Sequence, residues 1–313
     1  MKVVDLKDLK NIPVSFTLGS FDGFHKGHAV LLNRLKTAAE LNGSNTLVIS
    51  FYPHPRQVID SKFNLKLLND RDEKMSILTS FGIDYIHFIN FSKDFASTGF
   101  DEFYEKNIFS SIKVKSIIIG ENHGFGRNRK GNSALLEDIC KKHSVELIKV
   151  EPVSYKNTSI SSTRIRNCIT EGDLPEANAM LGYEYSLKGT VEKGKGLGKE
   201  LGFSTANISL DRSEKVVPRS GVYLTRVIVN GADYFGVSNC GHGPTTARQN
   251  SPLLLETHIF DFDMDIYGKE ITVRFIEKIR DEQKFPSIDE LKNAVEKDIK
   301  SAGFKINKFR ETE

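Results

Sequence analysis

The sequence predicts two domains, an α/β domain built on a parallel sheet and, after it, a small antiparallel β-barrel with a C-terminal helix. Three observations support this prediction. With 313 residues the chain has about twice the usual length of one domain. Its first half alternates apolar, β-branched runs with amphipathic stretches, as βαβ units do. Its second half consists mainly of short strand-like runs separated by Gly and Asn turns.

The strands of the α/β domain are expected in short runs rich in Val, Ile and aromatic residues, which are typical of strands buried on both faces. These runs cover 14–18, 46–52, 85–91 and 114–119. An amphipathic helix is expected over 28–41, where the apolar positions share one helical face, namely Leu31, Leu32, Leu35, Ala38 and Ala39.

The barrel strands are expected at 185–192, 222–229, 234–239, 253–262 and 271–276. Asn230 and Gly231 between two of these runs are the preferred residues of a two-residue hairpin turn. Ser287 and Glu290 have the spacing of a capping box, which predicts a final helix. Its apolar stripe is expected to comprise Ile288, Leu291, Val295 and Ile299. We therefore expect domains over 1–184 and 185–313.

Composition excludes several classes of protein. The 44 basic residues nearly balance the 41 acidic ones, which argues against a surface dedicated to nucleic acid. The three cysteines are far apart and form no CxxC pair, so neither a disulfide framework nor a zinc site is expected. The N-terminus lacks the apolar region of a signal peptide, and no apolar run reaches the ~18 residues of a membrane span. We expect a cytoplasmic protein with small-molecule substrates; the sequence leaves the oligomeric state open.

The residues from Gly19 to His28, GSFDGFHKGH, lie between the first expected strand and the first expected helix. The carboxyl end of a strand is where α/β sheets bind ligands. The glycines allow close approach of a phosphate chain, and the start of the helix attracts anions. His25 and His28 are expected to donate hydrogen bonds to charge that develops at phosphorus. A metal site is a weaker alternative, because no third ligand has suitable spacing.

This motif resembles the (H/T)xGH signature of the nucleotidyltransferase superfamily, which has a Rossmann-like parallel sheet. Together with the downstream sequence, it resembles the bifunctional bacterial riboflavin kinase/FMN adenylyltransferase family over essentially the whole chain. SSTRIR at 161–166 resembles the SSTxxR motif of that family, in which hydroxyls at a helix start precede an arginine suited to triphosphate oxygens. GENHGFG at 120–126 resembles its G-x-(D/N)-F-x-FG loop, although His123 replaces the usual aromatic residue.

The resemblance implies a role for individual residues of the adenylyltransferase site. His25 and His28 would be catalytic. The expected ATP and phosphate contacts are Gly19, Phe21, Asp22, Asn122, Ser162, Thr163 and Arg166.

A second site is expected in the barrel, where GKGLGKELGF at 194–203 is followed at once by STAN. The run is no Walker A loop, because it lacks the GK[ST] ending, and a plain turn is the alternative. The two stretches together resemble GxxxGRxLG(F/Y)PTAN of the family's kinase. The resemblance implies that Thr205 and Asn207 supply neutral oxygen ligands to Mg²⁺. The implied ATP contacts are Gly194, Lys195, Gly198 and Lys199.

LETHIFDF at 255–262 resembles the strand of the family that bears a catalytic glutamate, so Glu256 is the implied base. Arg280 lies in a stretch implied to contact the flavin. The resemblance implies two reactions: ATP phosphorylates riboflavin to FMN, and a second ATP adenylylates FMN to FAD. Three departures from the family pattern, Lys199, Ser204 and Gly243, keep alternatives open. The alternative functions are an adenylyltransferase with a weak or inactive kinase domain, and a flavin-binding regulator.

Overall fold

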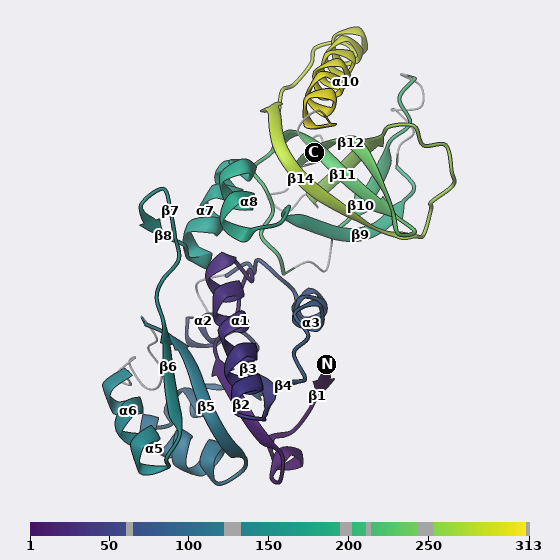
Figure 1. Ribbon diagram of the computed structural model, residues 1–313. Helices are drawn as coiled ribbons and strands as arrows, with labels where there is room; N and C mark the ends of the chain where they lie inside the picture. The colour runs from purple at the N-terminus through teal and green to yellow at the C-terminus, as the bar shows by residue number, and fades with distance from the viewer. Residues whose placement is uncertain (61–64, 122–132, 195–201, 211–213, 243–252, 311–313) are drawn as a thin grey trace. The chain divides into compact units, whose positions relative to one another are not determined.

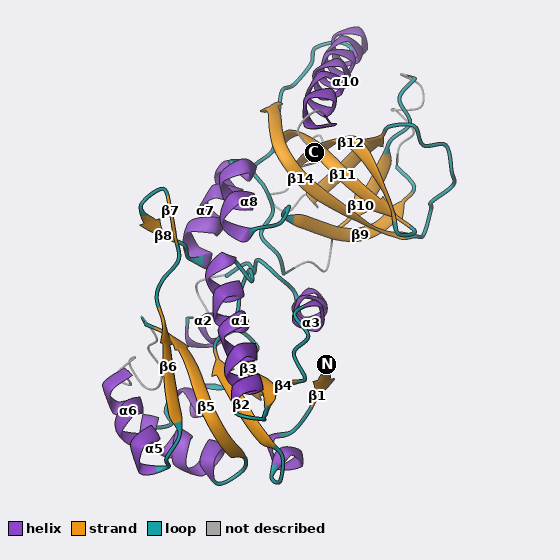
Figure 2. Cartoon of the chain, in the orientation of Figure 1, coloured by secondary structure: helices purple, strands orange, loops and turns teal. Residues whose placement is uncertain are grey.

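The structure is a computed structural model that describes residues 1–60, 65–121, 133–194, 202–210, 214–242 and 253–310 (Figures 1 and 2). The chain divides into two compact units, Met1–Ser162 and Thr163–Glu313. Helix α8 (Leu174–Leu181) and nearly all of α7 (Ser162–Glu171) therefore belong to the unit that contains the barrel. The functional boundary expected between residues 184 and 185 stays a prediction.

The first unit contains a parallel sheet with the strand order β1-β4-β3-β2-β5-β6, which confirms the predicted α/β class. Its strands are β1 (Lys2–Val3), β2 (Pro13–Leu18), β3 (Asn45–Tyr52), β4 (Tyr85–Asn90), β5 (Lys113–Gly120) and β6 (Glu146–Val150). From β2 the chain builds outward to β3 and β4 on one side, then to β5 and β6 on the other. The carboxyl end of β2 is therefore the switch point at which such sheets bind ligands.

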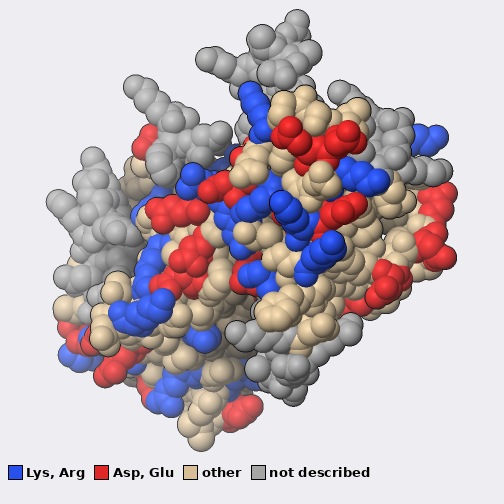
Figure 3. Space-filling model, turned by 90° about the horizontal axis from the view of Figure 1, so that it is seen from above, with Lys and Arg blue, Asp and Glu red and all other residues tan. Residues whose placement is uncertain are grey.

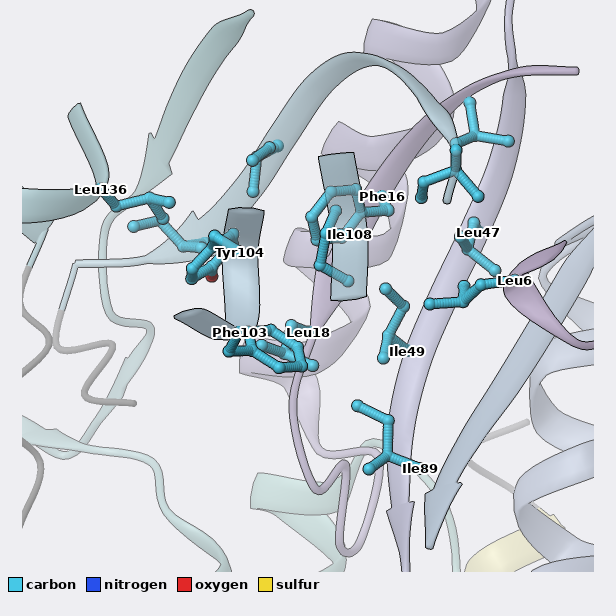
Figure 4. Packing of buried hydrophobic residues seen from close by; sticks show 14 of the residues in the cluster. Leu6, Phe16, Leu18, Leu47, Ile49, Ile89, Phe103, Tyr104, Ile108 and Leu136 are labelled. Carbon is cyan, nitrogen blue, oxygen red and sulfur yellow. The ribbon is translucent and has the colours of Figure 1, made fainter. Parts of the chain in front are cut away.

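Hydrophobic side chains cover both faces of this sheet, because successive residues of a strand point to opposite sides. Leu47 and Ile49 belong to one buried cluster, whereas Val48 between them belongs to another. The first cluster includes the residues labelled in Figure 4: Leu6, Phe16, Leu18, Leu47, Ile49, Ile89, Phe103, Tyr104, Ile108 and Leu136. The second cluster is completed by helix α1 (Lys26–Leu41), whose expected apolar face is buried.

The remaining helical segments of this unit are short, apart from α3 (Arg71–Ser80) and α6 (Ser133–Lys142). The short ones are η1 (Leu6–Leu9), α2 (Pro55–Ile59), α4 (Lys93–Ala96), α5 (Phe100–Glu102) and η2 (Phe103–Phe109). A small hairpin of β7 (Ser154–Tyr155) and β8 (Thr158–Ser159) leads to α7. Helix α3 matters most for the site, since it lies beside the loop that follows β2.

The second unit contains a closed barrel with the strand order β10-β13-β12-β11-β14-β9, as predicted. Its strands are β9 (Ser186–Glu192), β10 (Ala206–Ser209), β11 (Gly221–Val229), β12 (Ala232–His242), β13 (Leu253–Ile259) and β14 (Glu270–Asp281). Asn230 and Gly231 form the predicted hairpin turn, and both have the positive φ that such a turn requires (50° and 83°). Strand β13 ends three residues earlier than the expected 253–262, and β10 was not anticipated.

The final helix, α10 (Ile288–Arg310), begins where it was expected, and the Glu290 amide donates to the Ser287 hydroxyl at 3.2 Å. The expected apolar stripe was wrong in part, because Ile288 is 61% exposed. The buried positions of the helix include Asp298, which accepts from the Arg280 guanidinium at 2.8–3.1 Å, and the apolar Ala302 and Ile306. An apolar period alone misses an ion pair of this kind.

The surface charges and the cysteines can be compared with what the composition predicts. Basic and acidic side chains are interspersed on the face shown in Figure 3. All three cysteines are free, and two of them, Cys140 and Cys240, are buried. Among the described residues, no helix has both the length and the apolar character needed to cross a membrane.

The ion pair on α10 can be tested by replacing Arg280 with methionine. Arg280→Met leaves the Asp298 carboxylate, with a side chain only 7% exposed, without its cation. We expect α10 to open more easily by about 2 kcal/mol or more, so amide hydrogen exchange in this helix should accelerate at least roughly tenfold. Lys188→Met, which removes a pair with side chains 47% and 58% exposed, is the control. Equal exchange in both variants would contradict the assignment.

Candidate active sites

The loop between β2 and α1 has an unusual backbone. Phe21 and Phe24 have positive φ values of 47° and 34°, which residues other than glycine rarely adopt. Both rings are buried and stack with centroids 5.8 Å apart. Gly23 also has positive φ, and a Cβ there would lie 2.6 Å from Leu68 Cδ1. Anchored rings and a glycine under tight steric restriction therefore fix the conformation of this loop.

Polar contacts hold the same loop from two sides. The buried Asp22 carboxylate accepts from the Leu68 amide at 2.7 Å and from the Asn69 amide at 3.4 Å. The Ser162 hydroxyl donates to the Asp22 carbonyl at 2.7 Å. The structure thus brings the first loop and the start of the SSTRIR motif together within the first unit. Thr163 follows Ser162 directly, and both it and Arg166 belong to the second unit.

The two histidines lie side by side. Helix α1 begins at Lys26, two residues earlier than expected, with His25 at its N-cap and His28 in its first turn. Their rings stack with centroids 3.8 Å apart and an interplanar angle of 15°. Within the part of the chain that the structure describes, the Nδ1 atoms of both rings are buried and have no hydrogen-bond partner. In this side-by-side placement both rings can face one phosphate group.

Burial keeps both rings uncharged at neutral pH. It lowers the pKa of His25 from its ordinary 6.5 to about 4, although the Asp22 charge opposes the shift. It also holds the pKa of His28 well below its usual range, assisted by repulsion from His25 when that ring is protonated and by the Lys74 ammonium. A neutral imidazole has one N–H donor and one acceptor nitrogen. The pair therefore provides hydrogen-bond donors without bringing positive charge.

Sequence reasoning missed Lys74, a buried lysine beneath the loop. Its ammonium donates to the Ser20 carbonyl at 2.6 Å and to the Ser50 hydroxyl at 3.2 Å. Burial lowers the pKa of Lys74 to about 8, while the Asp22 charge raises it. Lys74 and Leu78, one turn apart, are the buried residues of α3. A lysine at an apolar position of a helix was the available signal.

In the barrel, strand register aligns residues that are distant in sequence. Asn207 on β10 lies directly opposite Glu256 on β13, and Glu256 lies opposite Asn239 on β12. Asn239 is opposite Val222 on β11, which is in turn opposite Arg280 on β14. Residues that are directly opposite share one face at Cα separations of roughly 4.5–5.5 Å. Predicted site residues thus form one row, and Asn239, which was not anticipated, stands within it.

A buried hydroxyl ladder occupies the other face of these strands. Ser238 bonds to both Thr225 and Thr257 at 2.8 Å, and all three side chains are fully buried. Because side chains alternate along a strand, the inward-facing Thr257 turns the neighbouring Glu256 outward. The ladder therefore sets which face bears the row.

The start of the glycine-rich run touches this row. A Cβ at Gly194 would lie only 2.1 Å from the Asn207 amide nitrogen, so no side chain fits there without displacing Asn207. The Thr205 side chain is half-buried just before β10. Several predicted positions lie outside the described residues, namely Asn122, His123, Lys195, Gly198, Lys199 and Gly243.

Comparison with known proteins agrees with the division of the chain into two units. The family model for FAD synthetase matches residues 8–164, and that for riboflavin kinase matches residues 181–304. A bifunctional riboflavin kinase/FMN adenylyltransferase of Haemophilus influenzae is 36% identical over 92% of each chain. A protein of the same name from Buchnera aphidicola is 35% identical over 90% of this chain and 91% of its own. The chain belongs to this bifunctional family.

A solved structure supports the fold of the family member described here. A Streptococcus pneumoniae protein named as a macrolide-efflux protein is 30% identical, with a TM-score of 0.86. The match covers 96% of this chain and 98% of that one. The two proteins share their fold along nearly their whole length.

The barrel residues fit a magnesium ion that is held mainly by its nucleotide. Among the described residues, no group of three or more His, Cys, Asp or Glu side chains forms a metal cage. Mg²⁺ needs no such cage when it keeps water and ATP phosphates as ligands. The Thr205 hydroxyl and the Asn207 amide are neutral oxygen donors of the required kind, and Asn207 lies opposite Glu256.

The depressed pKa of His25 predicts how stability depends on pH. The unfolded ring takes up a proton near pH 6.5 and the folded ring only near 4, so the unfolded state binds more protons between these values. The free energy of unfolding should therefore fall as pH drops through this window, with a contribution from His25 of about 3 kcal/mol. Urea unfolding of the first unit, followed by circular dichroism from pH 7.5 to 4, measures this dependence. His25→Gln should flatten it, whereas the exposed Lys26→Gln should not; an unchanged slope in His25→Gln would refute the assignment.

Proposed function

We propose that this chain makes flavin coenzymes in two ATP-dependent steps, each in its own site. It phosphorylates riboflavin to FMN, and it adenylylates FMN to FAD with release of pyrophosphate. The observation that carries this conclusion is that two different family models match successive parts of the chain. Each matched part contains its own phosphate-handling constellation, the stacked histidines in one and the Asn207–Glu256 row in the other.

In the adenylyl transfer, an FMN phosphate oxygen attacks the α-phosphorus of ATP, and the bond to the leaving pyrophosphate breaks. The buried, unpartnered Nδ1 atoms favour the tautomer in which each ring carries its proton on Nε2. His25 and His28 then donate hydrogen bonds to phosphate oxygens as charge builds up in the transition state. The first turn of α1 adds backbone amides and a partial positive charge. Gly19, Phe21 and Asp22 of the loop are proposed ATP and phosphate contacts.

The remaining predicted contacts of this step stay proposals. Thr163 and Arg166 on α7 are proposed to bind triphosphate oxygens, together with Ser162, which starts the same helix. Asn122 is proposed as a further nucleotide contact.

In the kinase step, Glu256 accepts the proton of the terminal ribityl hydroxyl as that oxygen attacks the γ-phosphorus of ATP, and ADP leaves. Mg²⁺ held by Thr205 and Asn207 would neutralise charge on the ATP phosphates. Asn207 lies opposite Glu256, which supports a single site for metal and base. Arg280, fixed by Asp298, is proposed to act on the flavin side of the row. Gly194, Lys195, Gly198 and Lys199 are proposed ATP contacts.

A second candidate function is an adenylyltransferase whose kinase is weak, because Ser204 replaces the proline of the family pattern. One contact argues for a working kinase. The His258 ring on β13 lies within hydrogen-bonding distance of the Ser204 carbonyl, with Nδ1 at 2.9 Å, and this contact restrains the loop that proline would have restrained. Conversion of riboflavin to FMN distinguishes the two candidates. A flavin-binding regulator would bind flavin tightly without releasing pyrophosphate.

The free state of all three cysteines supports a reducing compartment, and we propose that the protein is cytoplasmic. Its partners are proposed to be small-molecule substrates alone, because the charges on the face in Figure 3 are mixed rather than of one sign.

The two sites should be separable by mutation. His28→Ala should lower FMN-to-FAD conversion by roughly 100-fold or more, because a donor to the transition state is lost, while FMN still accumulates from riboflavin. Glu256→Ala should lower riboflavin phosphorylation by roughly 100-fold or more and leave FMN-to-FAD conversion intact. Chromatographic separation of riboflavin, FMN and FAD measures both steps.

Matched controls are Lys26→Ala beside the histidines and Glu270→Ala on β14, both at exposed positions. Each should keep both activities. Loss of both activities in His28→Ala or in Glu256→Ala would count against two independent sites.

A further inference from the structure

We propose that Lys74 is a positioning residue for adenylyl transfer, which fixes the Ser20 carbonyl and thereby the loop that carries His25 and His28. This inference rests on the proposed adenylyltransferase activity of the first unit. It assigns a role to a buried charge that the two-histidine mechanism does not use.

Lys74 joins three elements of the first unit at one carbonyl group. Its ammonium extends from α3 to the Ser20 carbonyl at 2.6 Å, and it also donates to the Ser50 hydroxyl of β3 at 3.2 Å. The Ser50 hydroxyl in turn donates to the same carbonyl at 3.4 Å. Ser50 is fully buried and Lys74 is 9% exposed, so the carbonyl is bound by two donors that have little access to water.

The same segment of chain also grips the loop on the other side of Phe21. The Leu68 amide binds the Asp22 carboxylate, while Lys74 binds the Ser20 carbonyl. Between these two attachment points stands Phe21 with its positive φ of 47°. A strained residue persists only where its surroundings determine its conformation. Residues 68–74 therefore act as a clamp across the strained point of the motif.

Charge gives Lys74 a second effect that a neutral donor would lack. A buried ammonium is costly unless an opposite charge compensates it, and Asp22 supplies that charge. Among the described residues, Lys74 and a protonated His25 disfavour protonation of His28, whereas Asp22 favours protonation of His25. Removal of the ammonium takes a positive charge away from His28, so the pKa of that ring should rise. The clamp thus also helps to keep the His28 ring neutral.

The test compares full-length Lys74→Met, which keeps the length of the side chain without its charge, with the wild-type enzyme. FAD formation from FMN and ATP is measured from about pH 3.5 to 9, and FMN formation from riboflavin in the same preparations reports on intact protein. We expect kcat for FAD formation to fall at least roughly tenfold. The acid limb of its pH profile, the range in which kcat declines as the pH falls, should move to higher pH. Kinase activity should stay within about twofold, and the exposed Lys113→Met should leave both activities unchanged.

Lys74→Arg supplies a second readout if the methionine variant folds poorly. It keeps the charge but displaces the donor, so kcat should fall while the acid limb stays in its wild-type position. The inference is overturned if either variant forms FAD at the wild-type rate. It is also overturned if Lys74→Met loses activity with an unmoved acid limb, since that result indicates a purely structural lysine. A wild-type enzyme that forms no FAD from FMN would instead overturn the proposed function, and this inference with it.

Discussion

The backbone between β2 and α1 passes through two phenylalanines in a left-handed conformation, each at a cost of about 1–3 kcal/mol. Burial of both rings and the contacts to Asp22 and Ser20 offset this cost. With the loop held in this way, His25 occupies the N-cap position of α1 and its ring stacks on His28. The position of the loop at the switch point of the sheet then presents both rings where a nucleotide would bind.

In the barrel, the register of paired strands, rather than a strained backbone, positions the side chains of the site. Its row from Asn207 to Arg280 draws one residue from each of several strands, so hydrogen-bonded pairing fixes their spacing. The buried hydroxyl ladder on the opposite face keeps that register, because a slip of one residue would bring Glu256 into the interior. The two proposed phosphate-transfer sites thus rest on different physical supports, a clamped loop and a register of strands.

Much of this organisation could be predicted from local sequence. The parallel strands, the Asn230–Gly231 turn and the first loop all have short-range signals, namely period, turn chemistry and glycine placement. The roles of Lys74, Asn239 and Asp298 could not, because each depends on a partner that folding brings near: Lys74 and Ser20 are 54 residues apart in sequence. Strand β10 spans only four residues and lacks an apolar period. Family resemblance supplied the roles of Thr205, Asn207 and Glu256, which no local pattern distinguishes from ordinary barrel residues.

The central claim is that one polypeptide performs two successive phosphate transfers on a flavin. The most direct measurement incubates the purified chain with riboflavin, ATP and Mg²⁺ and follows riboflavin, FMN, FAD and pyrophosphate with time. The account predicts that FMN appears first, that FAD follows at its expense, and that one pyrophosphate is released for each FAD. Absence of FAD and of pyrophosphate, even when FMN and ATP are supplied directly, would contradict it.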